Sequence, residues 1–122
     1  MSDRGIIAET ARRELALRER DWPIEVREGR MDAGTANADI AAWRAIAAMI
    51  EQGSAETQLG WEDLIGALRT AEDRRVEAAI AANGTRKEAV REERLGRIVT
   101  IRRLFERNAW RHGKCLSEKI AA

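Results

Sequence analysis

The pattern of apolar and polar residues predicts a chain built of helices. Its longest regular run lies in the last third, where apolar residues recur at steps of three to five, at Val90, Leu95, Ile98, Ile101, Phe105 and Ala109. This spacing is close to the helical period of about 3.6 residues, so these side chains share one face. Thr85 and Glu88 stand three apart after Asn83 and Gly84, which is the pattern of a capping box. We therefore expect the longest helix to span 85–111 and to bury this face.

Three more apolar lines predict three earlier helices, over roughly 4–28, 33–51 and 61–82. Their apolar members are Ile7, Ala11, Leu15, Trp22 and Val26 in the first, Ile40, Trp43, Ala47 and Ile50 in the second, and Trp61, Ile65, Leu68, Val76 and Ile80 in the third. Glu72 falls within the third line, and Arg102 falls within the apolar face of the last helix. Because a buried unpaired charge is costly, each is predicted to have a partner of opposite charge, and the two are able to pair with each other.

Residues with special backbone preferences mark the ends of these helices. Gly29 is predicted to end the first helix in a left-handed conformation, Asp32 to cap the start of the second, and Gly53 to end it. Pro23 lies inside the first helix, where it removes a hydrogen bond and clashes with the preceding turn, so we expect a kink or a short break there. The polar segment 54–60 lacks apolar periodicity and is predicted to be a hinge.

Together these elements predict an all-α fold, a small bundle of about four helices arranged as two antiparallel hairpins. A chain of 122 residues is one domain by length. A content of 44% hydrophobic and 35% charged residues, with a single Pro, favours helix over disorder. The expected single domain consists of a hairpin over 1–52, a hinge over 53–60, a hairpin over 61–111 and a short C-terminal tail over 112–122.

A further pattern extends from Glu14 to Ile46. An amphipathic segment, an aromatic-Pro pair, a Gly-Arg-Met turn and an acidic helix appear in order, at Glu14-Leu15-Ala16-Leu17-Arg18, Trp22-Pro23, Val26, Gly29-Arg30-Met31, Ala36, Asp39-Ile40 and Ala45-Ile46. In these elements and their spacing, residues 14–46 resemble a group of small phage and prophage proteins of unknown function. The sequence departs from their pattern at Asp21, Gly34 and Trp43, where an aliphatic residue, Ala and Met are expected. The resemblance implies a phage-derived origin and a helical hairpin, and it brings no known activity or site residue.

Basic residues gather toward the C-terminus although the chain is nearly neutral. The formal net charge is +1, yet the segment from Arg94 onward contains eight basic residues and two acidic ones. On the last helix, four arginines fall opposite the apolar face and predict a basic stripe, namely Arg97, Arg103, Arg107 and Arg111. The candidate residues for binding a protein or a nucleic acid are Arg97, Arg103, Arg107, Trp110, Arg111 and Lys114. Trp110 is the expected interface anchor, because a Trp among arginines is typical of binding hot spots.

Candidate catalytic and metal-binding residues form no complete set. His112 and Cys115 are the only His and Cys, whereas a zinc site needs three or four ligands. Glu25 and Glu28 match the Glu-x-x-Glu half of the pattern by which all-α nucleotide pyrophosphatases hold magnesium, but no Glu-x-x-Asp follows. There is no Gly-rich phosphate loop either. We therefore expect no enzyme activity, no metal and no cofactor.

The remaining hypotheses are binding functions. The first is a non-catalytic phage-derived protein that binds a host or phage protein and modulates or inhibits a host defence or replication component. The alternative is a nucleic-acid-binding accessory protein that contacts DNA or RNA with the basic stripe. Because the chain has a single cysteine and no apolar run long enough to span a bilayer, we expect no disulfide within the chain, no membrane partner and a location in the bacterial cytoplasm. A homodimer is compatible with the Ala-rich second helix and an exposed Trp.

Overall fold

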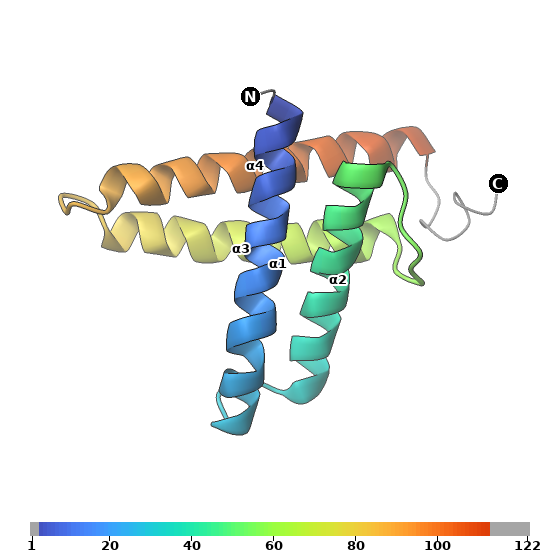
Figure 1. The fold of residues 1–122 in the computed structure, drawn as a ribbon. Helices are drawn as coiled ribbons and strands as arrows, with labels where there is room; N and C mark the ends of the chain where they lie inside the picture. Colours follow the sequence, from blue (N-terminus) through green and yellow to red (C-terminus); the bar gives the residue numbers. More distant parts are fainter. Residues whose placement is uncertain (1–2, 113–122) are drawn as a thin grey trace.

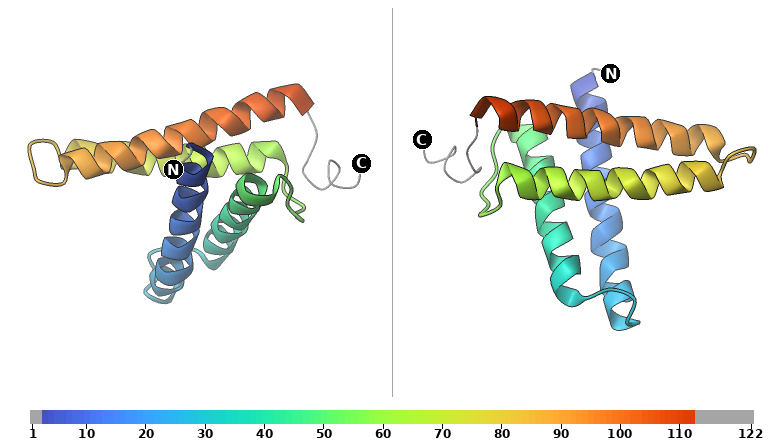
Figure 2. Two further views of the ribbon diagram at one scale, coloured as in Figure 1. Left: turned by 45° about the horizontal axis from the view of Figure 1, so that its top comes forward. Right: turned by 180° about the vertical axis from the view of Figure 1, so that it is seen from behind.

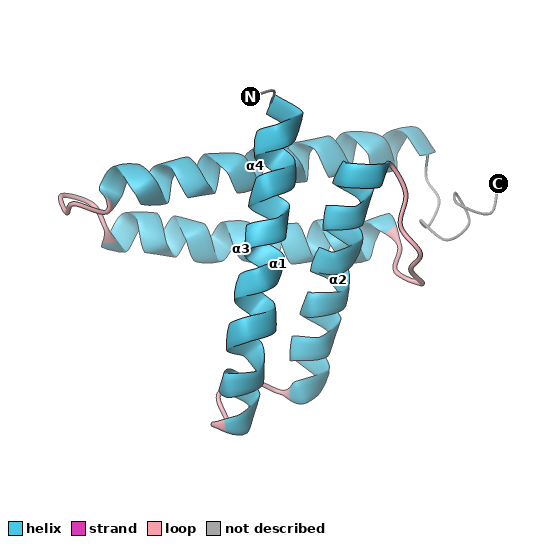
Figure 3. Ribbon diagram, in the orientation of Figure 1, coloured by secondary structure: helices cyan, strands magenta, loops and turns pink. Residues whose placement is uncertain are grey.

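The computed structural model describes residues 3–112, with side chains described over 5–108, and this part of the chain is helical and contains no strand (Figure 3). The helices are α1 (Asp3–Arg27), α2 (Ala33–Gln52), α3 (Trp61–Ala81) and α4 (Glu88–His112). The predicted all-α fold with four helices is confirmed. Within the described residues, no helix has both the length and the hydrophobicity needed to cross a membrane.

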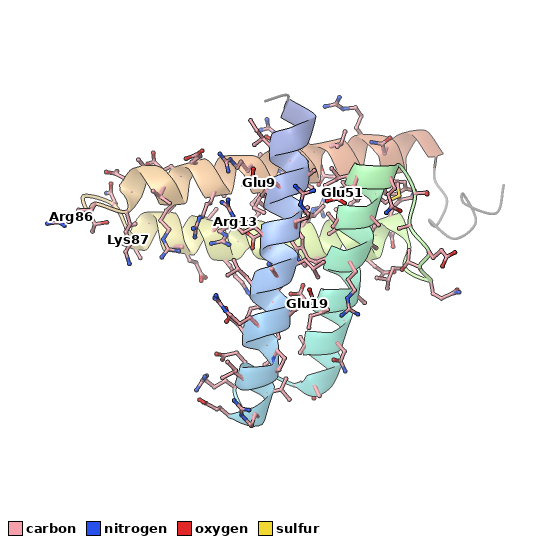
Figure 4. The ribbon with its side chains drawn as sticks, viewed as in Figure 1. Glu9, Arg13, Glu19, Glu51, Arg86 and Lys87 are labelled. Carbon is pink, nitrogen blue, oxygen red and sulfur yellow. The ribbon has the colours of Figure 1, made fainter. Side chains whose placement is uncertain are left out.

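The helices form two antiparallel hairpins that cross in two layers. α1 packs mainly on α2, and α3 packs mainly on α4. The hairpin of α1 and α2 lies across the other hairpin instead of alongside it (Figures 1 and 2). The predicted pair of hairpins is confirmed. Because the hairpins cross, the first covers only part of the second, and the end that carries the α3–α4 turn extends beyond α1, with Arg86 and Lys87 at its tip (Figure 4). We call residues 76–90 of this end the distal arm.

Hydrogen bonds at the ends of α1 and α2 confirm the predicted boundary residues. Gly29 is left-handed, with φ of 77°, and the Arg30 N–H donates to the Glu25 carbonyl oxygen at 2.9 Å. This is the bond pattern of a Schellman motif. The Asp32 carboxylate accepts a backbone N–H from the first turn of α2 at 3.1 Å. Gly53 ends α2 in the left-handed conformation, with φ of 79°.

Pro23 does not end α1, which continues through it, so of the kink or short break expected there the break is absent. Because Pro23 and Glu19 are exposed, water can bind the Glu19 carbonyl oxygen, which lacks its usual donor. One boundary prediction is wrong. Thr85 does not begin α4 through a capping box with Glu88. Its hydroxyl donates to the Ala82 carbonyl oxygen at 2.5 Å and accepts from the Lys87 N–H at 3.2 Å. Thr85 therefore belongs to the turn, and α4, with 25 residues, is as long as α1.

The predicted hinge joins the two hairpins without helical structure. This segment also contributes to the core, because Ala55 is only 6% exposed and belongs to the core cluster. At its end, the Gly60 N–H donates to the Asp63 carboxylate at 2.9 Å. This bond satisfies a free backbone donor at the start of α3 and fixes where the second hairpin begins.

The core lies between the hairpins where they cross. Its largest fully buried side chains are Trp43, Ile46, Leu64, Leu68, Ile98 and Ile101. Trp61 and Phe105 pack edge to face, with ring centroids 5.7 Å apart and an interplanar angle of 71°. Three side chains predicted to be in the core are instead exposed, namely Val76 by 37%, Ile80 by 71% and Val90 by 49%. They lie on the distal arm, which the first hairpin does not cover (Figure 1).

Candidate functional site

Buried charges lie in the interface between the two hairpins. We call Glu14 and Arg18 of α1, Asp39 of α2 and Arg75 of α3 the charged cluster. Arg18 donates to the carboxylates of Glu14 and Asp39, each at 2.8 Å. Arg75 donates to the other oxygen of Glu14 at 2.5 Å. The side chains of Glu14 and Arg18 are only 6% and 8% exposed. These charge-assisted hydrogen bonds therefore join three helices in a place with little water.

Two tryptophan rings, Trp22 and Trp43, lie against the guanidinium groups of Arg18 and Arg74. The Trp22 indole donates its N–H to Asp39 at 2.7 Å. The guanidinium of Arg18 lies 4.5 Å from the ring centroid of Trp43, and that of Arg74 lies 5.0 Å from the ring centroid of Trp22. At these distances the rings attract the cations. Both guanidinium groups are therefore positioned by more than their ion pairs.

The charged cluster is missing from the sequence predictions. Glu14 and Arg18 are four residues apart, which is the spacing of an ordinary solvated ion pair on a helix surface. The signal that identifies them is their place on the apolar face of the helix. Ala11, Glu14 and Arg18 follow one another at steps of three and four, so two charged residues continue an apolar line into the interface.

A cavity of about 460 Å³ lies beside the charged cluster, between α1, α3 and α4. We call it the arginine pocket, because its described lining includes the six arginines Arg18, Arg20, Arg74, Arg75, Arg91 and Arg94. Two carboxylates, those of Glu14 and Asp21, also line it. The pocket therefore concentrates positive charge at a place where three helices meet.

Both carboxylates of the arginine pocket are already occupied by hydrogen bonds. Glu14 accepts from two arginines of the charged cluster. Asp21 accepts from Arg20 at 2.8 Å, and this bond lowers the pKa of the Asp21 carboxyl. Three lining arginines form no ion pair within the described part of the chain, namely Arg74, Arg91 and Arg94. The positive charge of the pocket is therefore only partly compensated.

The structure describes the side chains of only some residues of the predicted basic stripe. Arg97 forms an ion pair with Glu93 one turn earlier. Arg103 and Arg107 are exposed and, over residues 5–108, have no carboxylate partner. The other three candidates lie outside the described side chains, namely Trp110, Arg111 and Lys114. Of the sequence candidates, the structure thus presents Arg103 and Arg107 as uncompensated cations one turn apart on the surface of α4.

The predicted pairing of Glu72 with Arg102 is confirmed. Arg102 donates from Nε and Nη2 to the two oxygens of Glu72, the second contact at 3.3 Å. The hydrogen bond to Glu72 raises the pKa of Arg102. Glu106 accepts from Arg69 at 2.9 Å and from Arg102 at 3.1 Å, and these bonds lower the pKa of its carboxyl. The network bridges α3 and α4, so it shows which sides of the two helices face each other.

Apolar side chains continue from this network toward the α3–α4 turn. On α3, two of them follow Glu72 at steps of four, and on α4, two precede Arg102 at steps of three and four. We call these four residues the apolar strip: Val76, Ile80, Leu95 and Val99. None of the four belongs to the core cluster. One broad face of the second hairpin is left uncovered by the first (Figure 2), so apolar surface along this seam is available to a partner.

The two carboxylates considered as magnesium ligands, those of Glu25 and Glu28, accept hydrogen bonds from Arg30 in the turn after α1. Arg30 donates to both oxygens of Glu25, at 2.7 and 3.0 Å, and to Glu28 at 2.5 Å. The bond from Arg30 lowers the pKa of Glu25. Within the described residues, no group of three or more His, Cys, Asp or Glu is placed to hold a metal ion. The side chain of His112 and the whole of Cys115 lie outside that part of the chain.

Comparison with known proteins gave no matching family model, no matching curated protein and no matching solved structure.

Proposed function

We propose that this chain is a non-catalytic, phage-derived protein-binding module whose apolar strip packs against a helix of a host or phage protein. The observation that carries the proposal is the exposure of Ile80, at 71%, one turn from Val76, at 37%. Apolar side chains that stay in water contribute little to folding, whereas a partner that covers them gains their burial energy. The resemblance of residues 14–46 to small phage proteins supports the phage origin and a location in the bacterial cytoplasm.

A helix is the partner element that suits this surface. The apolar strip follows the seam between two antiparallel helices, and an amphipathic helix places side chains into such a seam at spacings of three and four residues. An added strand would need the free backbone groups of a sheet edge, and the described residues contain no strand. Binding of this kind would modulate or inhibit a host defence or replication component by occupying its surface.

Affinity capture with matched variants tests the proposal. Tagged wild-type protein should retain a specific protein from bacterial lysate, and the double variant Val76→Glu/Ile80→Glu should lose it, because two buried charges would be added to the interface. Ile24→Glu is the matched control, since Ile24 is an exposed apolar residue, at 37%, on the other hairpin. A partner that is retained equally by the strip variant would contradict the proposal.

A second copy of the chain is the simplest competing occupant of the apolar strip. Light scattering during size-exclusion chromatography distinguishes it from a foreign partner. A monomer is expected for the purified wild-type protein. A dimer that becomes monomeric in Val76→Glu/Ile80→Glu, but not in Ile24→Glu, would assign the strip to self-association.

Nucleic-acid binding is the second candidate function, and it is favoured by one observation. Arg103 and Arg107 are exposed one turn apart, and no ion pair within the described residues uses either of them. Cations in this arrangement bind phosphate backbones with strong salt dependence. The test is a gel-shift series with single- and double-stranded DNA and RNA at low and physiological salt. Retention that is abolished by Arg103→Glu/Arg107→Glu supports this function, and retention that persists excludes the stripe as the site.

A further inference from the structure

We infer that the arginine pocket binds a small anionic ligand of the phosphate class, a molecule with one or two phosphate groups. The inference does not depend on the protein-binding proposal, because the pocket lies between α1, α3 and α4, whereas the apolar strip follows the α3–α4 seam. It begins from the imbalance of charge in the lining. Six arginines and two carboxylates line a cavity of about 460 Å³.

The two carboxylates do not neutralise the whole lining. Glu14 is held by two arginines of the charged cluster, and Asp21 is held by Arg20. Arg74, Arg91 and Arg94 remain without an ion pair in the described part of the chain. Like charges gathered in a partly enclosed space repel one another, and a bound anion relieves that repulsion.

The pocket is also preorganised. Arg18 and Arg75 are fixed by Glu14 at 2.8 and 2.5 Å, and the guanidinium of Arg74 is held 5.0 Å from the centre of the Trp22 ring. Side chains that are already positioned lose little conformational freedom when a ligand arrives. The fold thus presents a fixed floor of guanidinium groups to an incoming anion.

Folding alone does not explain arginines at these positions of α4. The buried residues Ile98, Ile101 and Phe105 follow one another at steps of three and four, and the same steps taken backward lead to Arg94 and Arg91. These two positions therefore continue the core-facing line of the helix. A sequence selected only for packing would place apolar residues there, and departures of this kind mark functional sites.

The shape and chemistry of the pocket favour phosphate over other anions. A guanidinium group forms paired hydrogen bonds to phosphate oxygens, and several such groups around one cavity suit a tetrahedral anion better than a planar carboxylate. The volume is that of a small-molecule site. Nucleic-acid backbones are read mostly by exposed cations on an outer surface, which describes Arg103 and Arg107 but not a cavity between three helices.

Isothermal titration calorimetry with pyrophosphate and with inorganic phosphate tests the inference. Wild-type protein should bind pyrophosphate, and Arg91→Gln/Arg94→Gln should weaken that binding by at least about tenfold, because two charge-assisted contacts are lost. Arg27→Gln/Arg86→Gln is the matched control, which removes the same charge from two exposed arginines that do not line the pocket, and it should change the affinity by less than about twofold. Without ligand, Arg91→Gln/Arg94→Gln should unfold at the same temperature as wild type or at a higher one, since it removes only repulsion.

Several outcomes would overturn the inference. These are no binding of pyrophosphate by the wild-type protein at millimolar concentration, equal weakening in both double variants, and tighter binding of citrate than of pyrophosphate. In a fourth outcome, Arg91→Gln/Arg94→Gln weakens the binding of a short single-stranded oligonucleotide as much as that of pyrophosphate. This result would assign the pocket to a nucleic-acid backbone. A lower unfolding temperature of that variant would show that the two arginines serve the fold.

Discussion

The two halves of the second hairpin differ sharply, although the same two helices build both. In the half that the first hairpin covers, Leu68 and Ile98 are fully buried. In the distal arm, Ile80 and Val90 are exposed by 71% and 49%. Among the described side chains, three of the four large apolar residues that are exposed lie on this arm. The covered half therefore contributes to the core, and the distal arm presents apolar surface to the solvent.

The comparison separates what helical periodicity decides from what packing decides. Periodicity places residues on one face along the whole length of a helix. Only the crossing of the hairpins decides how much of that face is covered. Toward the α3–α4 turn, the core-facing line of α4 continues in arginines, at Arg94 and Arg91. On α3, apolar side chains such as Ile80 remain exposed there. Both proposed sites thus use faces that the crossing leaves incompletely covered.

The largest expected effect comes from the covered half. Leu68→Ala should lower the free energy of unfolding by about 3–5 kcal/mol, because it removes a fully buried side chain and leaves a cavity. Urea unfolding followed by circular dichroism measures this. Val90→Ala, which truncates an apolar side chain on the distal arm, should cost less than about 1 kcal/mol. Similar losses in the two variants would remove the distinction between the halves.

The next effect concerns the charged cluster, which joins the covered half to the first hairpin. Glu14→Gln should cost about 2–3 kcal/mol, because Arg18 and Arg75 would stay buried without their carboxylate. Glu9→Gln on the same helix is the control. Glu9 pairs with Arg13 at 2.9 Å, and both side chains are nearly half exposed, so the loss should be under about 1 kcal/mol. Equal costs for the two variants would show that the cluster does not stabilise the crossing.

A smaller gain is expected where nothing packs against α4. A Cβ added at Gly96 would meet no atom within 4 Å, and Ala is a better helix former than Gly by about 0.5–1 kcal/mol. Gly96→Ala should therefore raise the unfolding temperature. Gly53→Ala, at a left-handed position with φ of 79°, should lower it and serves as the contrast. A decrease in the Gly96 variant would indicate a contact that the isolated chain does not show.

The smallest effect is a pH dependence from the ion pairs that bridge α3 and α4. Hydrogen bonds from Arg69 and then Arg102 lower the pKa of Glu106 below its ordinary value of 4.5. The stabilisation is therefore fully present above that value and is lost as the pH falls through the lowered pKa. Wild type should be more stable than Glu106→Gln near neutral pH, and the difference should shrink as the pH falls below 4.5. A difference that stays constant with pH would show that the carboxylate charge contributes nothing.

Much of the fold is predictable from sequence because its signals are local. Gly29, Asp32 and Gly53 mark helix ends through backbone conformation and capping, which depend on a few neighbouring residues. The pairing of Glu72 with Arg102 is predictable because each interrupts an apolar line, and a charge in such a place needs a partner. Thr85 shows the limit of local signals, since its hydroxyl bonds within the turn instead of capping α4.

The candidate sites were less accessible to sequence reasoning because they depend on how the hairpins cross. Val76 and Ile80 have core-like spacing, yet they are exposed by 37% and 71% on the distal arm, which the first hairpin does not cover (Figure 1). Arg91 and Arg94 are not among the residues that the sequence singles out, although they lie on the core-facing line of α4. Sequence separation hides such sites, since the arginine pocket brings residues from α1 together with residues about 70 positions later.

The most direct test of this account is the unfolding free energy of Val76→Ser/Ile80→Ser, measured by urea titration and compared with that of the wild-type protein. If the apolar strip is kept for a partner and not for folding, the free energy of unfolding should change by no more than about 0.5 kcal/mol, as for other surface substitutions. A loss of about 2 kcal/mol or more, comparable to that expected for a core truncation, would show that these side chains hold the hairpin together and would contradict the account.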